Sequence, residues 1–337
     1  MDKSQLCDLI SSAKQEDMKM YFITRLQKEN TNARTPFNEK YLFKIYQIQI
    51  TSEVRSYLYK LSVNQFEKIS QNEELTFLEY DVIDDDTNHL FTYSMKNKVH
   101  SFADMISEQL KNSPPKITNL HEILSDESLW AYSIEFQIDP NESFYTFRKI
   151  APSKVGIDEK EDQSKNLAQK VVRTVFNTNT NTLDLLKGET VNLDKQIDCI
   201  FFEDTFYVLR KYSFEELVGL QAEYTNKAFE ISKRMDTLAC FGDTKLLNEN
   251  IAKKPQLNRR LIKLEKLGNL QNLDERSIRK LVRLGKKNKS EINVKEGKIL
   301  FESESDIENT VKLLCDFFKT GEYSGKTYGT YAGRIQS

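Results

Sequence analysis

The stretch QIDCIFFEDTFYVLRKYSFEELVGLQAEYTNKAFEISKRM, residues 196–235, contains a pattern for strands followed directly by a pattern for a helix. Its first part is rich in β-branched and aromatic side chains on both sides of Glu203 and Asp204, which predicts a hairpin that turns there. Ser213 and Glu216 have the spacing of a capping box, which predicts one long helix to the end of the stretch. This succession favours an α+β fold with mixed, hairpin-rich sheets.

Similar patterns elsewhere predict further strands and helices. Strands and hairpins are expected in segments 20–26, 41–50, 76–93, 130–150 and 291–301. Helices are expected in segments 102–110, 167–176 and 306–318. The segment 76–93 is expected to hold two strands around a turn at Asp84 to Asp86.

The length of 337 residues is enough for one large domain or two ordinary ones. An apolar fraction of 39%, with 20 Phe and 15 Tyr, is typical of a folded protein. The polar stretch 151–166 is the best candidate for a boundary. We therefore predict an N-terminal α+β domain at 1–152, for sensing, dimerisation or docking, and a C-terminal domain at 153–337 with basic helices at 257–289.

Export, a membrane span, a metal and a cofactor are not expected. The N-terminus lacks a secretory signal and charges interrupt every apolar run, so we expect a cytoplasmic protein. The cysteines are far apart and form no C-x-x-C pair: Cys7, Cys199, Cys240 and Cys315. The three histidines also lack the spacing of metal ligands.

Positive charge is concentrated in residues 253–289. This window has 13 Lys and Arg against three acids, a net charge of +10. The whole chain has a net charge of −2, so the other 300 residues carry −12. A chain polarised in this way is expected to meet a negatively charged partner through the window.

The first basic helix is predicted over 257–267. Leu257, Leu261 and Leu264 share one face at helical spacing. The cations on the opposite face are Arg259, Lys263 and Lys266. The short connection GNLQN leads to a second helix, so the two are expected to form a helical hairpin with their positive sides on one surface.

The second basic helix is more sharply divided. Asn272 and Glu275 have capping-box spacing, and Ile278, Leu281 and Val282 follow as an apolar stripe. All the basic residues fit within an arc of roughly 120° opposite that stripe. They are Arg276, Arg279, Lys280, Arg283, Lys286 and Lys287.

The nine cations on these two helices are the predicted DNA-binding residues. Cations at this density neutralise phosphates and release counterions, which gives affinity without sequence specificity. Ordinary helix faces mix Glu with Lys, whereas like charges crowded together destabilise a helix by about 0.3 kcal/mol per pair. A face almost without acid therefore favours a polyanion, with DNA as the leading partner. A non-catalytic adaptor for an acidic protein or an anionic membrane surface, and a solvated face without a partner, stay open.

Catalytic motifs are weak, so we expect a protein that is not an enzyme. Glu296, Gly297 and Lys298 have the E-x-K form found in nucleases, but the first two lie at a predicted hairpin turn. A metal-dependent nuclease is the alternative. The ending 320–337 is expected either to be flexible or to form an arm of tyrosines and cations that stacks on bases or docks on a partner.

The second half resembles the KwaB family of the two-gene Kiwa anti-phage system of bacteria. The resemblance covers about residues 190–330. It rests on the hairpin and FEEL helix of the opening stretch, the basic helices, and INVKEGKILFESESDIENTVKLLCDFF with its Tyr-containing tail. It implies a cytoplasmic DNA-binding effector that interferes with phage DNA replication. It also implies a partner, the small multi-pass membrane protein KwaA, and with it recruitment to the inner membrane. A homodimer is expected as well.

Overall fold

A computed structural model describes residues 3–331 with the gaps given at the end of this paragraph. The chain divides into two compact units, which are described separately. Unit 1 consists of Met1–Glu79 and Asn88–Val218, and unit 2 of Tyr80–Thr87 and Gly219–Ser337. The residues outside the description are 1–2, 32–34, 36, 74, 83–88, 95–101, 103–104, 111, 118–119, 121–122, 125–126, 141, 152–154, 157–173, 178–181, 186–189, 194–195, 272 and 332–337.

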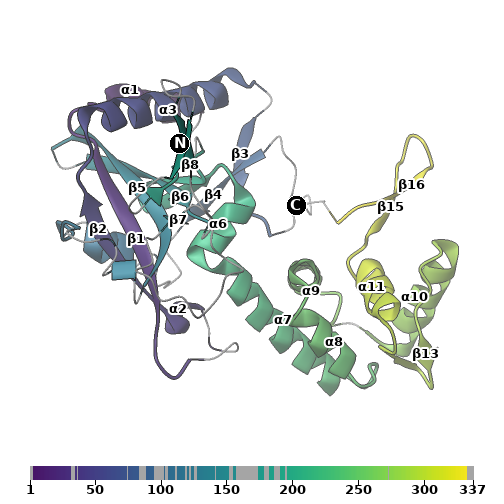
Figure 1. Ribbon diagram of the computed structural model, residues 1–337. Helices are drawn as coiled ribbons and strands as arrows, with labels where there is room; N and C mark the ends of the chain where they lie inside the picture. Colours follow the sequence, from purple (N-terminus) through teal and green to yellow (C-terminus); the bar gives the residue numbers. More distant parts are fainter. Residues whose placement is uncertain are drawn as a thin grey trace. The chain divides into compact units, whose positions relative to one another are not determined.

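Unit 1 is built on an eight-stranded mixed sheet with the order β2-β1-β5-β6-β11-β12-β4-β3 (Figure 1). Neighbouring strands are antiparallel except β3 and β4, which are parallel. The strands are β1 (Lys19–Gln27), β2 (Tyr41–Ile48), β3 (Thr76–Glu79), β4 (His89–Ser94), β5 (Ser128–Asp139), β6 (Glu142–Lys149), β11 (Cys199–Phe202) and β12 (Thr205–Val208).

Both faces of this sheet carry apolar side chains, because the central strands are buried on both sides. Helices α1 (Lys3–Ser12) and α3 (Ser52–Gln71) lie side by side over one face, where Leu6, Leu58 and Phe66 join its core (Figure 1). On the other face Phe43, Phe102, Phe147, Phe206 and Phe214 form a chain of ring contacts. Phe214 comes from α6 (Lys211–Val218), and the π-helical turn η1 (Met105–Leu110) lies beside β2. The short helix α2 (Phe37–Lys40) precedes β2.

The hairpins predicted from turn residues are confirmed. Glu203 and Asp204 have φ of 46° and 55° between β11 and β12, which is the pattern of a type I′ turn. Glu296 and Gly297 form a second turn of this type, with φ of 51° and 77°, between β13 (Val294–Lys295) and β14 (Lys298–Ile299). β5 and β6 pair as expected within 130–150, and the α+β class is confirmed.

Strands β3 and β4 occur where the segment 76–93 predicts them, but their parallel pairing corrects the expected turn between them. Parallel neighbours need a crossover connection, which no tight turn provides. Here the connection is Tyr80–Thr87, which belongs to unit 2. Asp84 to Asp86 lie outside the described residues.

The helix predicted at 167–176 is wrong at its end, where β8 (Thr174–Asn177) pairs with β9 (Thr182–Leu185). Its earlier residues lie outside the description. A further small pair joins β7 (Val155–Gly156) to β10 (Thr190–Val191). The division into units also differs from the predicted boundary at 152/153, because β11 and β12 complete the same sheet as β5 and β6.

The long helix predicted over 214–235 is two helices. α6 begins at Lys211, before the expected cap at Ser213, and α7 (Leu220–Thr237) follows after Gly219. Gly219 has φ of 78°, a left-handed conformation that glycine adopts without steric cost and that ends a helix. Unit 1 ends and unit 2 begins at this break.

Unit 2 is mainly helical. α9 (Pro255–Leu267) packs along α7 and against α8 (Lys245–Ile251), while α10 (Glu275–Lys287) packs against α11 (Glu304–Leu314) (Figure 1). The two basic helices are present as predicted. They do not pack mainly on each other, because α9 packs chiefly on α7 and α10 packs on α11. α11 ends at Leu314 rather than at 318, and β15 (Phe318–Thr320) then pairs with β16 (Thr327–Gly329). In the part of the chain that the structure describes, no helix has both the length and the apolar character needed to cross a bilayer.

Candidate nucleic-acid interface

Helix α10 begins with a side-chain cap. The Asp274 carboxylate accepts a hydrogen bond from the Ser277 backbone amide at 2.7 Å. The hydrogen bonds from Ser277 and the nearby Arg276 hold the pKa of Asp274 below its usual value. The predicted cap was Asn272, which lies outside the described residues, so the structure moves the cap to Asp274. A carboxylate here also interacts favourably with the positive end of the helix dipole.

One face of α10 is fixed against the rest of unit 2. Ile278, Leu281 and Gly285 are buried, as two positions of the predicted stripe require, and Val282 is half-buried. Gly285 lies against the segment that follows the helix, because an added Cβ would be 2.7 Å from the Ser290 carbonyl oxygen. The amide of Ser290 donates to the Gly285 carbonyl at 2.9 Å. The orientation of the opposite face is therefore set by close packing.

The opposite face of α10 carries all six of its cations, and all six are exposed: Arg276, Arg279, Lys280, Arg283, Lys286 and Lys287. Arg279 pairs with Glu275 at 3.1 Å, an exposed i,i+4 contact. Within the described residues, the other five form no ion pair. Arg276, Lys280, Arg283 and Lys287 line one shallow hollow of this face, together with Ser277 and Leu284.

The three predicted cations of α9 are placed differently. Lys266 is exposed, whereas Arg259 and Lys263 are half-buried. The Lys263 ammonium donates a hydrogen bond to the Tyr331 carbonyl, and burial and the neighbouring Lys319 lower the pKa of Lys263. Arg259 also has interactions within the chain. The exposed positive surface is thus carried chiefly by α10.

The residues that hold the end of the chain were not predicted from the sequence. The Arg260 guanidinium lies 4.3 Å from the centre of the Tyr331 ring, which contacts the Phe317 ring at 4.6 Å. Beyond this anchor, the β15–β16 hairpin carries Tyr323, which is fully exposed, and Tyr328, which is 53% exposed. The alternation of Gly and Tyr in this segment was a signal for an arm, but its attachment to α9 depends on residues far apart in the chain.

A nuclease site gains no support from Glu296. Its backbone occupies a hairpin turn, and both charged residues of the E-x-K form, Glu296 and Lys298, are exposed. Among the residues that the structure describes, no three His, Cys, Asp or Glu side chains gather as metal ligands. His100 and His121 lie outside the description, as does the side chain of His89.

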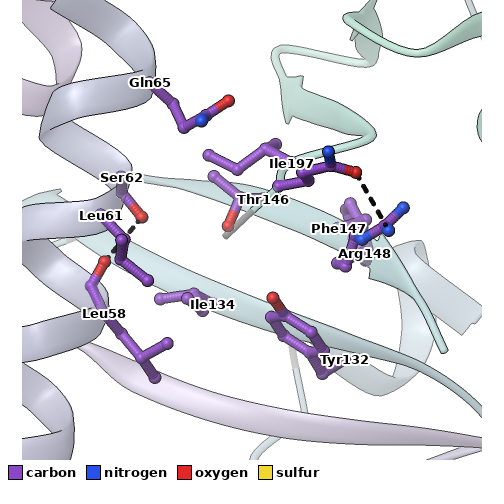
Figure 2. Close-up of a pocket in the computed structure, with 11 residues that line it drawn as sticks. Leu58, Leu61, Ser62, Gln65, Tyr132, Ile134, Thr146, Phe147, Arg148 and Ile197 are labelled. Carbon is purple, nitrogen blue, oxygen red and sulfur yellow. Dashed lines mark hydrogen bonds between the residues drawn. The ribbon is translucent and has the colours of Figure 1, made fainter. Parts of the chain in front are cut away.

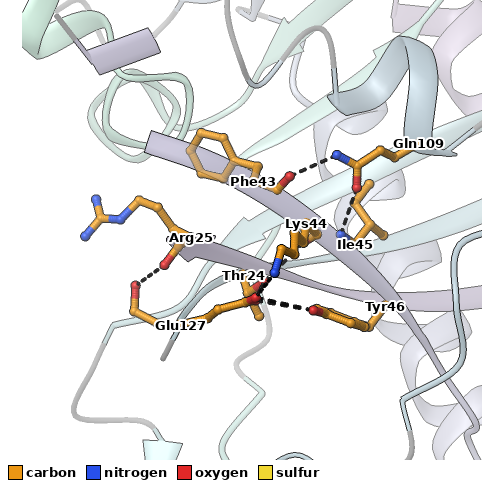
Figure 3. A network of polar contacts seen from close by, with 9 residues as sticks. Thr24, Arg25, Phe43, Lys44, Ile45, Tyr46, Gln109 and Glu127 are labelled. Atoms are coloured by element: carbon orange, nitrogen blue, oxygen red, sulfur yellow. Dashed lines mark hydrogen bonds and ion pairs between the residues drawn. The ribbon is translucent and has the colours of Figure 1, made fainter. Parts of the chain in front are cut away.

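The polar groups inside unit 1 hold the sheet together. The Glu127 carboxylate accepts hydrogen bonds from Thr24, Lys44 and Tyr46, and Gln109 bridges two backbone groups of β2 (Figure 3). The narrow pocket between α3 and the sheet is lined mostly by apolar side chains, and at its edge Arg148 donates to Gln196 (Figure 2). These groups are paired with one another, so they do not form a charged surface.

Asp198 is another paired charge inside unit 1, and it is fully buried beside β11. Its carboxylate accepts from Arg148 at 2.5 Å and from the Lys149 amide at 2.7 Å, and lies 3.6 Å from Arg210. Burial raises the pKa of Asp198, while these three contacts oppose that rise. The cluster joins β6 to β11 and to the end of β12.

A comparison with known families adds an identification to this geometry. The family described as "Kiwa protein KwaB-like" matches residues 126–322, more than half of the chain. The match begins before the resemblance noted at about 190, so it includes β5 and β6 as well as the hairpin β11–β12 and the basic helices. No curated protein and no solved structure matches the chain significantly. The chain belongs to the KwaB-like family of Kiwa proteins.

Proposed function

We propose that this protein is a DNA-binding effector of Kiwa anti-phage defence that acts without catalysis and interferes with phage DNA replication. Membership of the KwaB-like family supports the defence role. The observation that carries DNA binding is the face of α10, where six exposed cations meet a single paired acid, Glu275.

The dimensions of α10 suit a phosphate backbone. Its 13 residues extend over roughly 20 Å. A DNA duplex presents about twelve phosphates over that length, so every cation on the face has phosphates within reach. Because the buried face of α10 is fixed by Gly285 and Ile278, these cations need little reorganisation to meet DNA.

The absence of compensating acids on most of this face argues against a merely solvated helix. Like charges three and four residues apart repel each other and weaken the helix. A polyanion relieves that repulsion and releases its own counterions on binding. An acidic protein or an anionic membrane surface would relieve it too, but neither presents phosphates along a regular line as a nucleic-acid backbone does.

We propose a homodimer that is recruited to the inner membrane by KwaA, with unit 1 as the part that senses, dimerises or docks. The support for the KwaA partnership is the family's place in the Kiwa system. The support for this role of unit 1 is that the nine predicted DNA-binding cations all belong to unit 2, while the buried carboxylates Asp198 and Glu127 of unit 1 are paired internally.

A DNA titration at several salt concentrations tests the proposal. The full-length protein is expected to bind blunt duplex with a slope of log K against log salt of up to about −5, at about 0.9 per phosphate for six contacts. Absence of binding at moderate salt would favour the adaptor. Incubation with plasmid and Mg²⁺ or Mn²⁺ addresses catalysis, because strand scission that is lost in Glu296→Ala would establish the nuclease instead.

A further inference from the structure

The hairpin of β15 and β16 is a projection next to α10. Its strands pair from Phe318↔Gly329 to Thr320↔Thr327, and its loop is closed by the Gly321 amide, which donates to the Lys326 carbonyl at 2.9 Å. Figure 1 shows it as an arm that extends from the end of α11. Strands of three residues carry the loop roughly 10 Å from the anchored base.

The base of this hairpin is held by close packing. A Cβ added to Gly329 would be 2.5 Å from the Phe317 ring, and the Thr330 amide donates to the Phe317 carbonyl at 2.9 Å. Tyr331 is held in turn by Arg260 and Lys263 of α9. The arm therefore has a defined direction relative to the helices of unit 2.

The hairpin and α10 share a surface. A hollow between them is lined by Leu284 and Lys287 of α10, by its C-cap residue Asn288 and by Leu313 of α11. On the hairpin side it is lined by Asp316, Phe317, Phe318, Thr320 and Thr327. Lys287 belongs to both this hollow and the cation face of α10. A DNA strand that leaves that face next to Lys287 thus meets the hairpin within about three nucleotides.

Two aromatic rings are exposed on this arm beside cations. Tyr323 in the loop is fully exposed, and Tyr328 is 53% exposed, with Lys326 between them in the sequence. Tyr328 contacts its own hairpin, because its hydroxyl lies 3.2 Å from the Ser324 hydroxyl and a Cβ added to Gly321 would be 3.1 Å from its ring. Tyr323 is therefore the ring that is open to solvent on both faces. Bases stack on exposed aromatic rings regardless of sequence, but only when they are unpaired.

We infer that the β15–β16 hairpin is a second DNA contact that stacks an unpaired base on Tyr323. The preferred ligand is then a duplex with an adjoining single-stranded segment, with α10 on the duplex phosphates and the hairpin on the unpaired bases. This inference rests on the proposed binding of duplex DNA by α10.

Fluorescence anisotropy with three DNAs tests the inference on the full-length protein: a blunt duplex, the same duplex with a single-stranded overhang at either end, and the single strand alone. The overhang is expected to raise affinity over the blunt duplex by on the order of tenfold. Tyr323→Ala should remove that gain and leave the blunt-duplex affinity unchanged, whereas Tyr323→Phe should keep it. Tyr57→Ala, which removes a 53% exposed tyrosine from α3, should change neither.

A 2-aminopurine base in the overhang adds a direct readout of stacking. Its fluorescence should be quenched by the parental protein and by Tyr323→Phe, but not by Tyr323→Ala. Blunt-duplex binding with a steep salt slope, but without any gain from the overhang or any effect of Tyr323→Ala, would overturn this inference and leave the proposed function intact. No binding to blunt duplex by the parental protein would overturn both.

Discussion

Asp198 in unit 1 and Arg283 in unit 2 show two different uses of charge within one chain. Asp198 is fully buried and meets Arg148, the Lys149 amide and Arg210. Arg283 is exposed on a helix face where most cations lack an acidic partner. A buried charge without partners is strongly destabilising, whereas an exposed one costs little. The charge at Asp198 thus contributes to the stability of unit 1, whereas the charge at Arg283 is exposed and available for binding in unit 2.

Removal of the Asp198 carboxylate is expected to have the largest effect on stability. Asp198→Ala leaves Arg148, whose side chain is only 12% exposed, without its closest partner. Loss of one member of a buried ion pair costs roughly 3–5 kcal/mol. Urea unfolding followed by the emission of Trp130, the one tryptophan of the sequence and part of β5 in unit 1, measures this loss.

Asp198→Asn is the matched control for that variant. Its amide oxygen can still accept a hydrogen bond from the Lys149 amide, so it should cost less than Asp198→Ala. The folded fraction of both variants should bind DNA with the parental affinity. Loss of DNA affinity in folded Asp198→Asn would break the comparison, because a buried charge of unit 1 would then act in binding.

Charge reversal on α10 is expected to give the opposite result. The triple variant Arg279→Glu, Arg283→Glu and Lys287→Glu changes only exposed side chains, so the circular dichroism should stay unchanged and the thermal midpoint should fall only slightly, through loss of the exposed Glu275–Arg279 pair. Loss of three phosphate contacts should flatten the salt slope by about 2.7 and weaken duplex binding by about two orders of magnitude at physiological salt. Phage protection should be lost together with DNA affinity.

The matched control reverses three exposed lysines of unit 1: Lys14→Glu, Lys60→Glu and Lys68→Glu. It changes the net charge of the chain by the same amount, so it separates a site on α10 from general electrostatic attraction. We expect it to keep most of the parental affinity and slope. Equal losses in the two triple variants would show that α10 is not the DNA site.

The face of α10 was predictable because helical spacing fixes it locally. Once a helix is assumed around Ile278 and Leu281, arithmetic places the six cations opposite them. The type I′ hairpins were predictable for the same reason, since their turn residues are adjacent in sequence.

Features that depend on distant residues were not predictable. Lys263 was assigned to the same kind of face as Lys280, yet it donates to a carbonyl 68 residues further along the chain. The parallel pairing of β3 with β4 requires a crossover connection, which a turn pattern such as Asp84 to Asp86 does not indicate. Gly219 did carry a local signal, because glycine often ends helices, but the apolar pattern on both sides concealed it.

Gly285 lies on the buried face of α10, and its substitution should lower stability less than Asp198→Ala does. Gly285→Ala would place a methyl group 2.7 Å from the Ser290 carbonyl oxygen, so backbone must shift. Overpacking of this kind costs roughly 1–3 kcal/mol, less up to about 1 kcal/mol from the better helix propensity of alanine. Circular dichroism during urea unfolding measures the change.

Gly268→Ala tests the alternative cause, backbone strain, because that site has open space but φ of 69°. An unchanged midpoint in Gly285→Ala would contradict the close packing.

The smallest expected effect has opposite signs for stability and for binding. Glu275 is the acid paired with Arg279 on the cation face, and it lies in the first turn of α10, where a negative charge stabilises the helix. Glu275→Gln should therefore lower stability by about 0.5 kcal/mol through loss of this pair and of the charge near the helix dipole. The same change frees Arg279 and removes a charge that repels phosphate, which at a separation of several ångströms should raise duplex affinity about threefold.

Glu304→Gln is the control, because Glu304 is the first residue of α11 and pairs with Lys254 at 2.7 Å in a comparably exposed position. That variant should lose similar stability with no gain in affinity. If both glutamine variants gain affinity equally, the effect is one of net charge, and the face of α10 is not special; if Glu275→Gln alone gains, the helix gives up DNA affinity at this position for its own stability.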